Sequence, residues 1–76
     1  MNKNIDILWI DDEIHFLKSH IIFLEKKGYN VESIHSGEDA IELIQHKYFD
    51  IILLDEMMTG MDGLETLKHI KNIFST

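Results

Sequence analysis

The sequence predicts an α/β fold in which helices cover a parallel sheet. Three short apolar runs of strand length alternate with three longer segments whose apolar residues recur at helical spacing. Strands separated by helices of about 10 to 15 residues are typical of right-handed βαβ units, which build parallel sheets. The 76 residues suffice for one small domain. Because the chain has no proline and only four glycines, we expect no internal linker.

The first strand is expected at Ile5–Ile10, a β-branched and aromatic run that ends in Asp11 and Asp12. Its nearly continuous apolar character is typical of a strand that is buried on both faces. A helix is expected from Glu13 to Lys27, with Gly28 in the position of a C-cap. The apolar face of this helix consists of Ile14, Leu17, Ile21 and Leu24.

A second strand is expected at Tyr29–His35, followed by a second helix. Ser36 is placed to cap this helix, which we expect to end near His46. The run Ile51–Leu54 is fully apolar and has the length of a buried strand, so it predicts the third strand. The inner face of the second helix is expected to hold Ala40, Leu43 and Ile44.

A third helix is expected to begin after Asp62, because Asp62 and Glu65 have the spacing of a capping box. Asp6 and Asp50, which lie at the openings of strands, are expected to be solvated turn residues. The inner face of the third helix is expected to hold Leu64, Leu67, Ile70 and either Ile73 or Phe74.

Charge and composition exclude several classes of partner. Fourteen acidic residues stand against seven basic ones, and the net charge of −7 argues against direct binding of nucleic acid or of an anionic membrane surface. The chain has no cysteine, so it has neither a disulfide framework nor a thiolate metal site. The first apolar run is too short for a signal peptide or a membrane span, and we expect a cytoplasmic protein.

Carboxylates follow two of the predicted strands directly. Asp11 and Asp12 come after the first strand, and Asp55 comes after the third. Because ligand sites of open α/β sheets lie beyond the carboxyl ends of the strands, we expect these aspartates to meet in one crevice. Unit charges about 4 Å apart repel by roughly 4 kcal/mol at an effective dielectric of about 20, and a divalent cation reverses the sign of that interaction. Oxygen ligands favour a hard ion, with Mg²⁺ as the first choice.

Other chemistry is compatible with acids at strand ends. Either acidic end alone is more often a helix cap or a turn, and Asp12 is also placed to cap the helix that follows it. The run that ends in Asp55 and Glu56 matches the Walker B element of P-loop ATPases, but no G-x-x-x-x-G-K-[ST] segment occurs. A D-x-D phosphatase is disfavoured because Asp11 and Asp12 are adjacent.

The segments ILWIDDE and DIILLDEMMTGMDGLETL resemble the first and third strand motifs of the response regulator receiver domain, the phosphoacceptor module of bacterial two-component signalling. The resemblance covers essentially the whole chain. It implies a flavodoxin-like parallel sheet with strand order 2-1-3, in which residues 1–76 form the amino-terminal part of a receiver, truncated before strand four. More narrowly, ILWIDDEI with HIIFLEKKGYNVE is similar to the receiver domain of PorX-type regulators of the type IX secretion system.

By position, the resemblance implies that Asp55 is the phosphorylated aspartate. Asp12 would bind Mg²⁺ directly, Asp11 would bind it mainly through water, and the main-chain carbonyl of Met57 would be the remaining protein ligand. The ion neutralises charge between the carboxylate and the phosphoryl group, while the phosphodonor supplies the high-energy bond. We therefore expect a phosphoacceptor and not an enzyme. The hydroxyl and lysine that complete the site in the family would lie beyond Thr76.

The expected partners are a histidine kinase, an output domain and the remainder of a receiver fold beyond residue 76. Three strands and three helices leave one edge of the third strand, and part of one sheet face, without cover. The alternative function is therefore an interaction module: a truncated receiver that is not phosphorylated and forms a homodimer through this edge.

Two further groups of residues are expected to have structural roles. Trp9 is expected in the core. The histidines show no matched spacing for a metal site, so we expect them at the surface. They are His15, His20, His35, His46 and His69.

Overall fold

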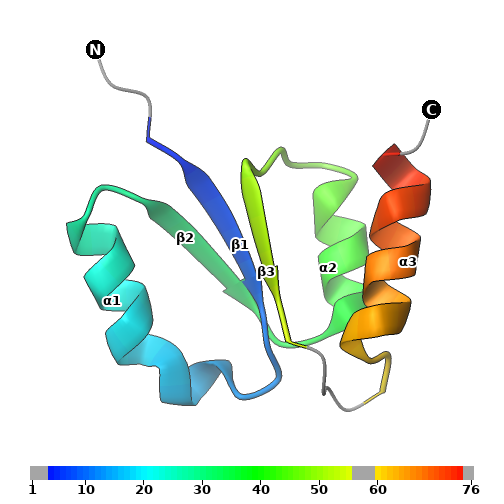
Figure 1. Ribbon diagram of the computed structural model, residues 1–76, viewed down its shortest axis with the longest axis horizontal. Coiled ribbons are helices and arrows are strands. Elements are labelled where there is room, and N and C mark those ends of the chain that lie inside the picture. Colours follow the sequence, from blue (N-terminus) through cyan, green and yellow to red (C-terminus); the bar gives the residue numbers. More distant parts are fainter. Residues whose placement is uncertain (1–3, 56–59, 75–76) are drawn as a thin grey trace.

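The computed structural model of the chain describes residues 4–55 and 60–74. Three strands form one parallel sheet in the order β2-β1-β3, as the sequence predicts. Helix α1 covers one face of the sheet, and α2 and α3 lie side by side on the other (Figure 1). The elements are β1 (Asp6–Ile10), the 3₁₀ helix η1 (Ile14–Leu17), α1 (Lys18–Lys26), β2 (Asn30–Ile34), α2 (Gly37–Ile44), β3 (Ile51–Leu54) and α3 (Gly63–Phe74).

The core lies between the sheet and the α2–α3 pair. Leu8 and Ile10 of β1 are fully buried there, and they pack with three buried residues of the helices, Ala40, Ile44 and Ile70. Because side chains alternate along a strand, Trp9 lies on the opposite face, towards α1. It is half-buried and lines a hollow with Phe23 and Leu24, so its expected place in the core was wrong.

The uncovered part of the sheet is at β3, as the sequence predicts. Among the described residues β3 pairs only with β1. Ile51 and Leu53 are 40% and 37% exposed, while Ile52 and Leu54 pack against the core. A fully apolar strand is typical of burial on both faces, and here only one of its faces is well covered.

The first predicted helix is divided in the structure. Instead of one helix from Glu13, η1 comes first and α1 begins at Lys18, because Leu17, the last residue of η1, has φ −104° and ψ 9°, outside the helical range. The predicted inner residues of this segment are all half-buried, and none is fully buried. This follows from the partial cover of that face of the sheet, since α1 lies beside β2 and packs mainly against that strand (Figure 1).

The buried face of helix α3 agrees with the predicted one only at Ile70, which is in the core. Leu64, Leu67 and Ile73 are exposed, although their spacing predicted the inner face. The buried residues of α3 are Gly63, Thr66 and Ile70. The small residues at the start of α3 lie towards α2, and that contact sets the orientation of the helix.

Polar contacts join the amino ends of the strands. Asp50 accepts a hydrogen bond from the main-chain N–H of Asp6 through Oδ2 at 2.8 Å, and Asn30 Nδ2 donates to Asp6 Oδ1 at 3.1 Å. The two aspartates therefore hold strand ends together. Asp50 is exposed and lies in a bend, as predicted, but Asp6 is half-buried and is the first residue of β1, so its expected place in a solvated turn was wrong. The ammonium of Lys47 donates to Glu32 at 2.7 Å, and this hydrogen bond, with the attraction to the same carboxylate, raises the pKa of Lys47.

Candidate metal site

The register of the sheet brings the carboxyl ends of the strands level. Ile10, the last residue of β1, lies opposite Ile34 of β2 and Leu54 of β3. The next residues continue the ladder: the N–H of Asp11 donates to the carbonyl of Ile34, and the N–H of Asp55 donates to the carbonyl of Ile10, both at 3.0 Å. Main-chain hydrogen bonds thus fix where both aspartates leave the sheet.

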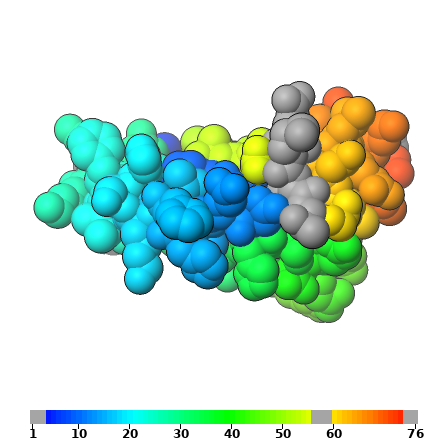
Figure 2. Space-filling view, turned by 90° about the horizontal axis from the view of Figure 1, so that it is seen from below, coloured from blue at the N-terminus to red at the C-terminus, as the bar shows by residue number. Residues whose placement is uncertain are grey.

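Asp11, Asp12 and Asp55 come together at this end of the molecule. One carboxylate oxygen of each lies within 4.8 Å of the others, and all three residues are half-buried. Over residues 4–55 and 60–74 they form the one group of three or more acidic or histidine side chains with the spacing to hold a metal ion. Figure 2 looks onto this end, where the blue surface of the segment after β1 borders the green surface around the start of α2.

A local hydrogen bond shapes the turn that carries two of these carboxylates. Asp11 accepts from the main-chain N–H of Glu13 through Oδ1 at 2.9 Å, in the manner of an Asx-turn. Because its Oδ1 is engaged in the turn, its second oxygen is the one better placed to act on an ion, directly or through water.

The donor set fits a small divalent cation. Three carboxylates whose oxygens lie at most 4.8 Å apart repel one another, by about 3.5 kcal/mol for each pair of unit charges at an effective dielectric of about 20, before the reduction by solvent. A divalent cation replaces that repulsion by attraction. All three ligands offer only oxygen, and their half-buried position leaves room for the waters that Mg²⁺ retains. The fourth predicted ligand, the carbonyl of Met57, lies outside the described residues.

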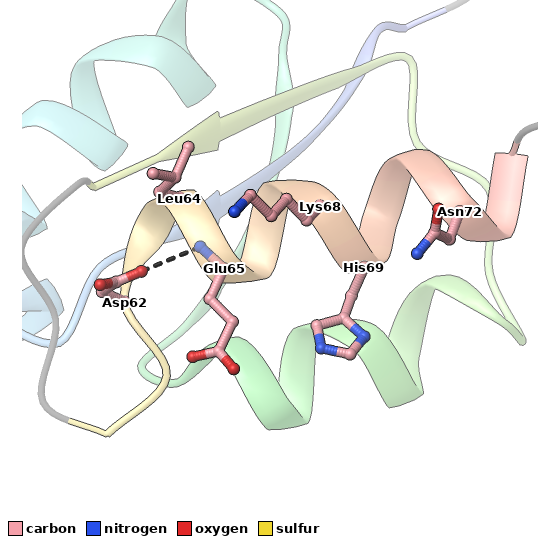
Figure 3. Close-up of a pocket in the computed structure, with 6 residues that line it drawn as sticks. All are labelled: Asp62, Leu64, Glu65, Lys68, His69 and Asn72. Atoms are coloured by element: carbon pink, nitrogen blue, oxygen red, sulfur yellow. Dashed lines mark hydrogen bonds between the residues drawn. The ribbon is translucent and has the colours of Figure 1, made fainter.

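Other hollows of the described surface do not offer comparable chemistry. One lies along α3 and is lined by Asp62, Leu64, Glu65, Lys68, His69 and Asn72 (Figure 3). Its polar side chains come from one helix and its cap, and Glu65 and His69 extend towards α2 instead of converging with Asp62. All five histidines are exposed, as predicted.

Known proteins are similar to this chain in sequence and in fold. The family model of the response regulator receiver domain matches residues 7–76. The transcriptional regulatory protein ZraR of Escherichia coli is 44% identical over 70 residues, which make up 92% of this chain and 16% of that protein. The crystal structure of the N-terminal domain of a response regulator receiver protein from Methanoculleus marisnigri matches with a TM-score of 0.81 and 39% identity, over 87% of this chain and 54% of that one.

A third match carries a ligand in its own structure. The response regulator protein TrrA of Thermotoga maritima, in complex with Mg(2+)-BeF, matches with a TM-score of 0.84 and 28% identity, over 92% of this chain and 61% of that one. The chain therefore spans between half and two thirds of these solved chains, and a much smaller part of ZraR.

In the described part of the chain, no helix has the length and apolar character needed to cross a bilayer. The predicted strand order 2-1-3 is confirmed. With the family match over residues 7–76, these features show that the chain belongs to the response regulator receiver domain family of two-component systems.

Proposed function

We propose that this chain accepts a phosphoryl group on Asp55 from a histidine kinase or a small phosphodonor, with Mg²⁺ held by Asp11, Asp12 and Asp55. The observation that carries the proposal is the convergence of three half-buried carboxylates within 4.8 Å at the carboxyl ends of β1 and β3. The match to TrrA, whose structure contains Mg²⁺ and BeF, supports the same assignment.

Each aspartate has a separate task in this proposal. A carboxylate oxygen of Asp55 attacks phosphorus, the bond from phosphorus to the donor breaks, and the donor leaves with that electron pair. The hydrogen bond from the N–H of Asp55 to the carbonyl of Ile10 holds the nucleophile at the end of β3. Asp11 and Asp12 hold the ion, which, when bound, neutralises the negative charges that approach each other. The main-chain carbonyl of Met57 remains a predicted ligand.

The chain itself becomes modified, so we propose a stoichiometric phosphoacceptor and not an enzyme. The same proposal includes a histidine kinase as donor, a cytoplasmic location, and an output domain together with further receiver structure outside the 76 residues. The chain covers 16% of ZraR, and the activity of such a longer protein is part of the proposal. The narrower similarity to PorX-type regulators stays a prediction.

Labelling with a small phosphodonor tests the proposal. The full chain is incubated with acetyl phosphate, with Mg²⁺ or with EDTA, and the product is trapped by borohydride and mapped by mass spectrometry. We expect incorporation only with Mg²⁺, on the peptide that contains Asp55, because the three clustered carboxylates otherwise repel an anionic donor. Equal incorporation in EDTA, or a label on a histidine, would contradict the proposal.

The exposed edge of β3 is the observation behind a second candidate, the interaction module. Among the described residues this edge has no partner strand, and its apolar side chains Ile51 and Leu53 are partly exposed. Unpaired sheet edges recruit other strands, so a second copy of the chain could pair there. This candidate predicts a dimer in sedimentation velocity at tens of micromolar chain, and a monomer under those conditions would remove its support.

A further inference from the structure

The first turns of α2 and α3 touch where α2 has no side chain. Gly37 is the first residue of α2 and is buried, and it faces Thr66, which is fully buried. A Cβ atom at position 37 would overlap Thr66 Oγ1, and it would lie 3.2 Å from Thr66 Cβ and 3.3 Å from Met61 Sδ. A side chain at position 37 therefore requires Thr66 to turn its hydroxyl away or to move together with the start of α3. In Figure 2 the yellow and gold surface of the α3 start lies against the green surface of α2.

Thr66 has little freedom to move away. Its hydroxyl donates to the carbonyl of Asp62 at 2.8 Å, and its main-chain N–H donates to the same carbonyl at 2.9 Å. Asp62 in turn accepts from the N–H of Glu65 through Oδ1 at 2.9 Å (Figure 3). A side chain at position 37 would therefore push against the whole capped first turn of α3.

The first turn of α2 also lies close to Gly60, a residue between Asp55 and the start of α3. Gly60 has φ +81°, and a Cβ atom there would lie 3.4 Å from Oε2 of Glu38. Residues near both ends of the segment 60–66 thus lie against the first turn of α2. That turn is itself held, because Ser36 caps it by accepting from the N–H of Asp39 at 3.1 Å.

We propose that Gly37 is a positioning residue for phosphoryl acceptance, an inference that rests on the function proposed for Asp55. Gly37 touches no reacting atom. Because it has no side chain, Gly37 lets the start of α3 pack closely on α2, and this contact holds Met61 and Thr66, which are six and eleven residues beyond Asp55. Small displacements of reacting groups have large effects on the rate of reaction. The contact of Gly37 with the start of α3 therefore controls the position of the Asp55 carboxylate.

The test is Gly37→Ala in the full chain. Alanine is a better helix former than glycine, so without the contact the change would be harmless. With the contact, we expect the rate of labelling by acetyl phosphate to fall on the order of tenfold and the half-saturating Mg²⁺ concentration to rise. Amide hydrogen exchange should also quicken at Asp55 but not at Asp50, whose N–H donates to the carbonyl of Asp6 at the opposite end of β3.

The rescue variant separates positioning from a general loss of stability. Thr66→Ala removes the hydroxyl that Gly37→Ala would strike, so we expect the double variant to recover most of the labelling rate and the slow exchange at Asp55. Unchanged behaviour of Gly37→Ala would overturn the proposal, and so would a loss that the double variant does not recover. If Gly37→Ala fails to fold, the double variant decides: a folded, labelled protein supports the contact, and any other result overturns it.

Amide exchange tests the positioning role of Gly37 separately from phosphoryl acceptance on Asp55. If the wild-type chain is not labelled at all, the proposed function fails. Faster exchange at Asp55 in Gly37→Ala, with recovery in the double variant, would still show that Gly37 positions the end of β3. Equal exchange in all three proteins would refute the positioning role even in a chain that is labelled normally.

Discussion

Asp55→Asn is expected to reduce Mg²⁺-dependent labelling by acetyl phosphate to background. The amide is neutral and a poor nucleophile, so it does not attack phosphorus at a useful rate. The side chains have nearly the same shape, and the hydrogen bond that holds position 55 comes from the main-chain N–H to the carbonyl of Ile10, which the substitution leaves intact. We therefore expect a folded chain without an acceptor, measured by intact-mass spectrometry after a fixed incubation.

The matched control for this variant is the aspartate at the other end of β3. Asp50→Asn also removes one carboxylate, but it does so before β3, where Asp50 accepts from the N–H of Asp6. An asparagine side-chain oxygen can still accept that hydrogen bond. Labelling of Asp50→Asn is expected to match the wild type. Labelling of Asp55→Asn at the wild-type level would refute the assignment of Asp55, whatever the control shows.

The arrangement of the sheet follows from short-range features of the sequence. Ile51–Leu54 is a strand in the structure with the predicted bounds, because an apolar run of that length between acids has few other ways to be buried. Parallel strands joined by right-handed crossovers then place their carboxyl ends on one edge. For this reason the proximity of Asp11, Asp12 and Asp55 could be predicted from the sequence, and the structure brings them within 4.8 Å.

The details that depend on contacts between distant segments could not be predicted in this way. Helical spacing placed Leu64 and Leu67 on the inner face of α3, yet Thr66 is the residue that is buried against α2. A small polar residue gives no hydrophobic signal, and its burial depends on a glycine 29 positions earlier. The one available signal was the spacing of Gly63, Thr66 and Ile70, which fits one helix face.

The division of the first helix has a similar origin. Apolar periodicity continues from Ile14 to Leu24, so the sequence predicted one helix. In the structure the Asx-turn of Asp11 directs the chain out of β1, and a 3₁₀ turn precedes α1. The periodicity indicates which side chains face the sheet. It does not indicate whether the backbone that carries them is an α-helix or a 3₁₀ helix.

The clustered carboxylates have two expected effects: they bind Mg²⁺, and they repel one another when no ion is bound. Asp12→Asn is the variant that separates these effects. We expect the half-saturating Mg²⁺ concentration to rise on the order of a hundredfold, since even changes in the outer shell of metal sites cost roughly 10- to 100-fold in affinity. The measurement is the emission of Trp9, the only tryptophan of the chain, which lies three positions before Asp12. Labelling at a Mg²⁺ concentration that saturates the wild type should fall accordingly.

Without Mg²⁺ the same substitution is expected to act in the opposite direction. Removing one of three carboxylates within 4.8 Å relieves repulsion, so the free energy of unfolding of the metal-free variant should equal or exceed that of the wild type. Adding Mg²⁺ at about 100 times its dissociation constant should stabilise the wild type by about 2.7 kcal/mol and the variant by far less. Urea unfolding with and without Mg²⁺ measures both quantities.

Glu25→Gln is the control for net charge, because Glu25 is an exposed acid of α1. It lowers the negative charge of the chain by the same amount as Asp12→Asn, away from the three aspartates. If both variants lost Mg²⁺ affinity equally, the ion would be responding to the overall field of an acidic protein and not to a site. A loss confined to Asp12→Asn, together with the gain in metal-free stability, requires that the carboxylates at the ends of β1 and β3 act on one ion.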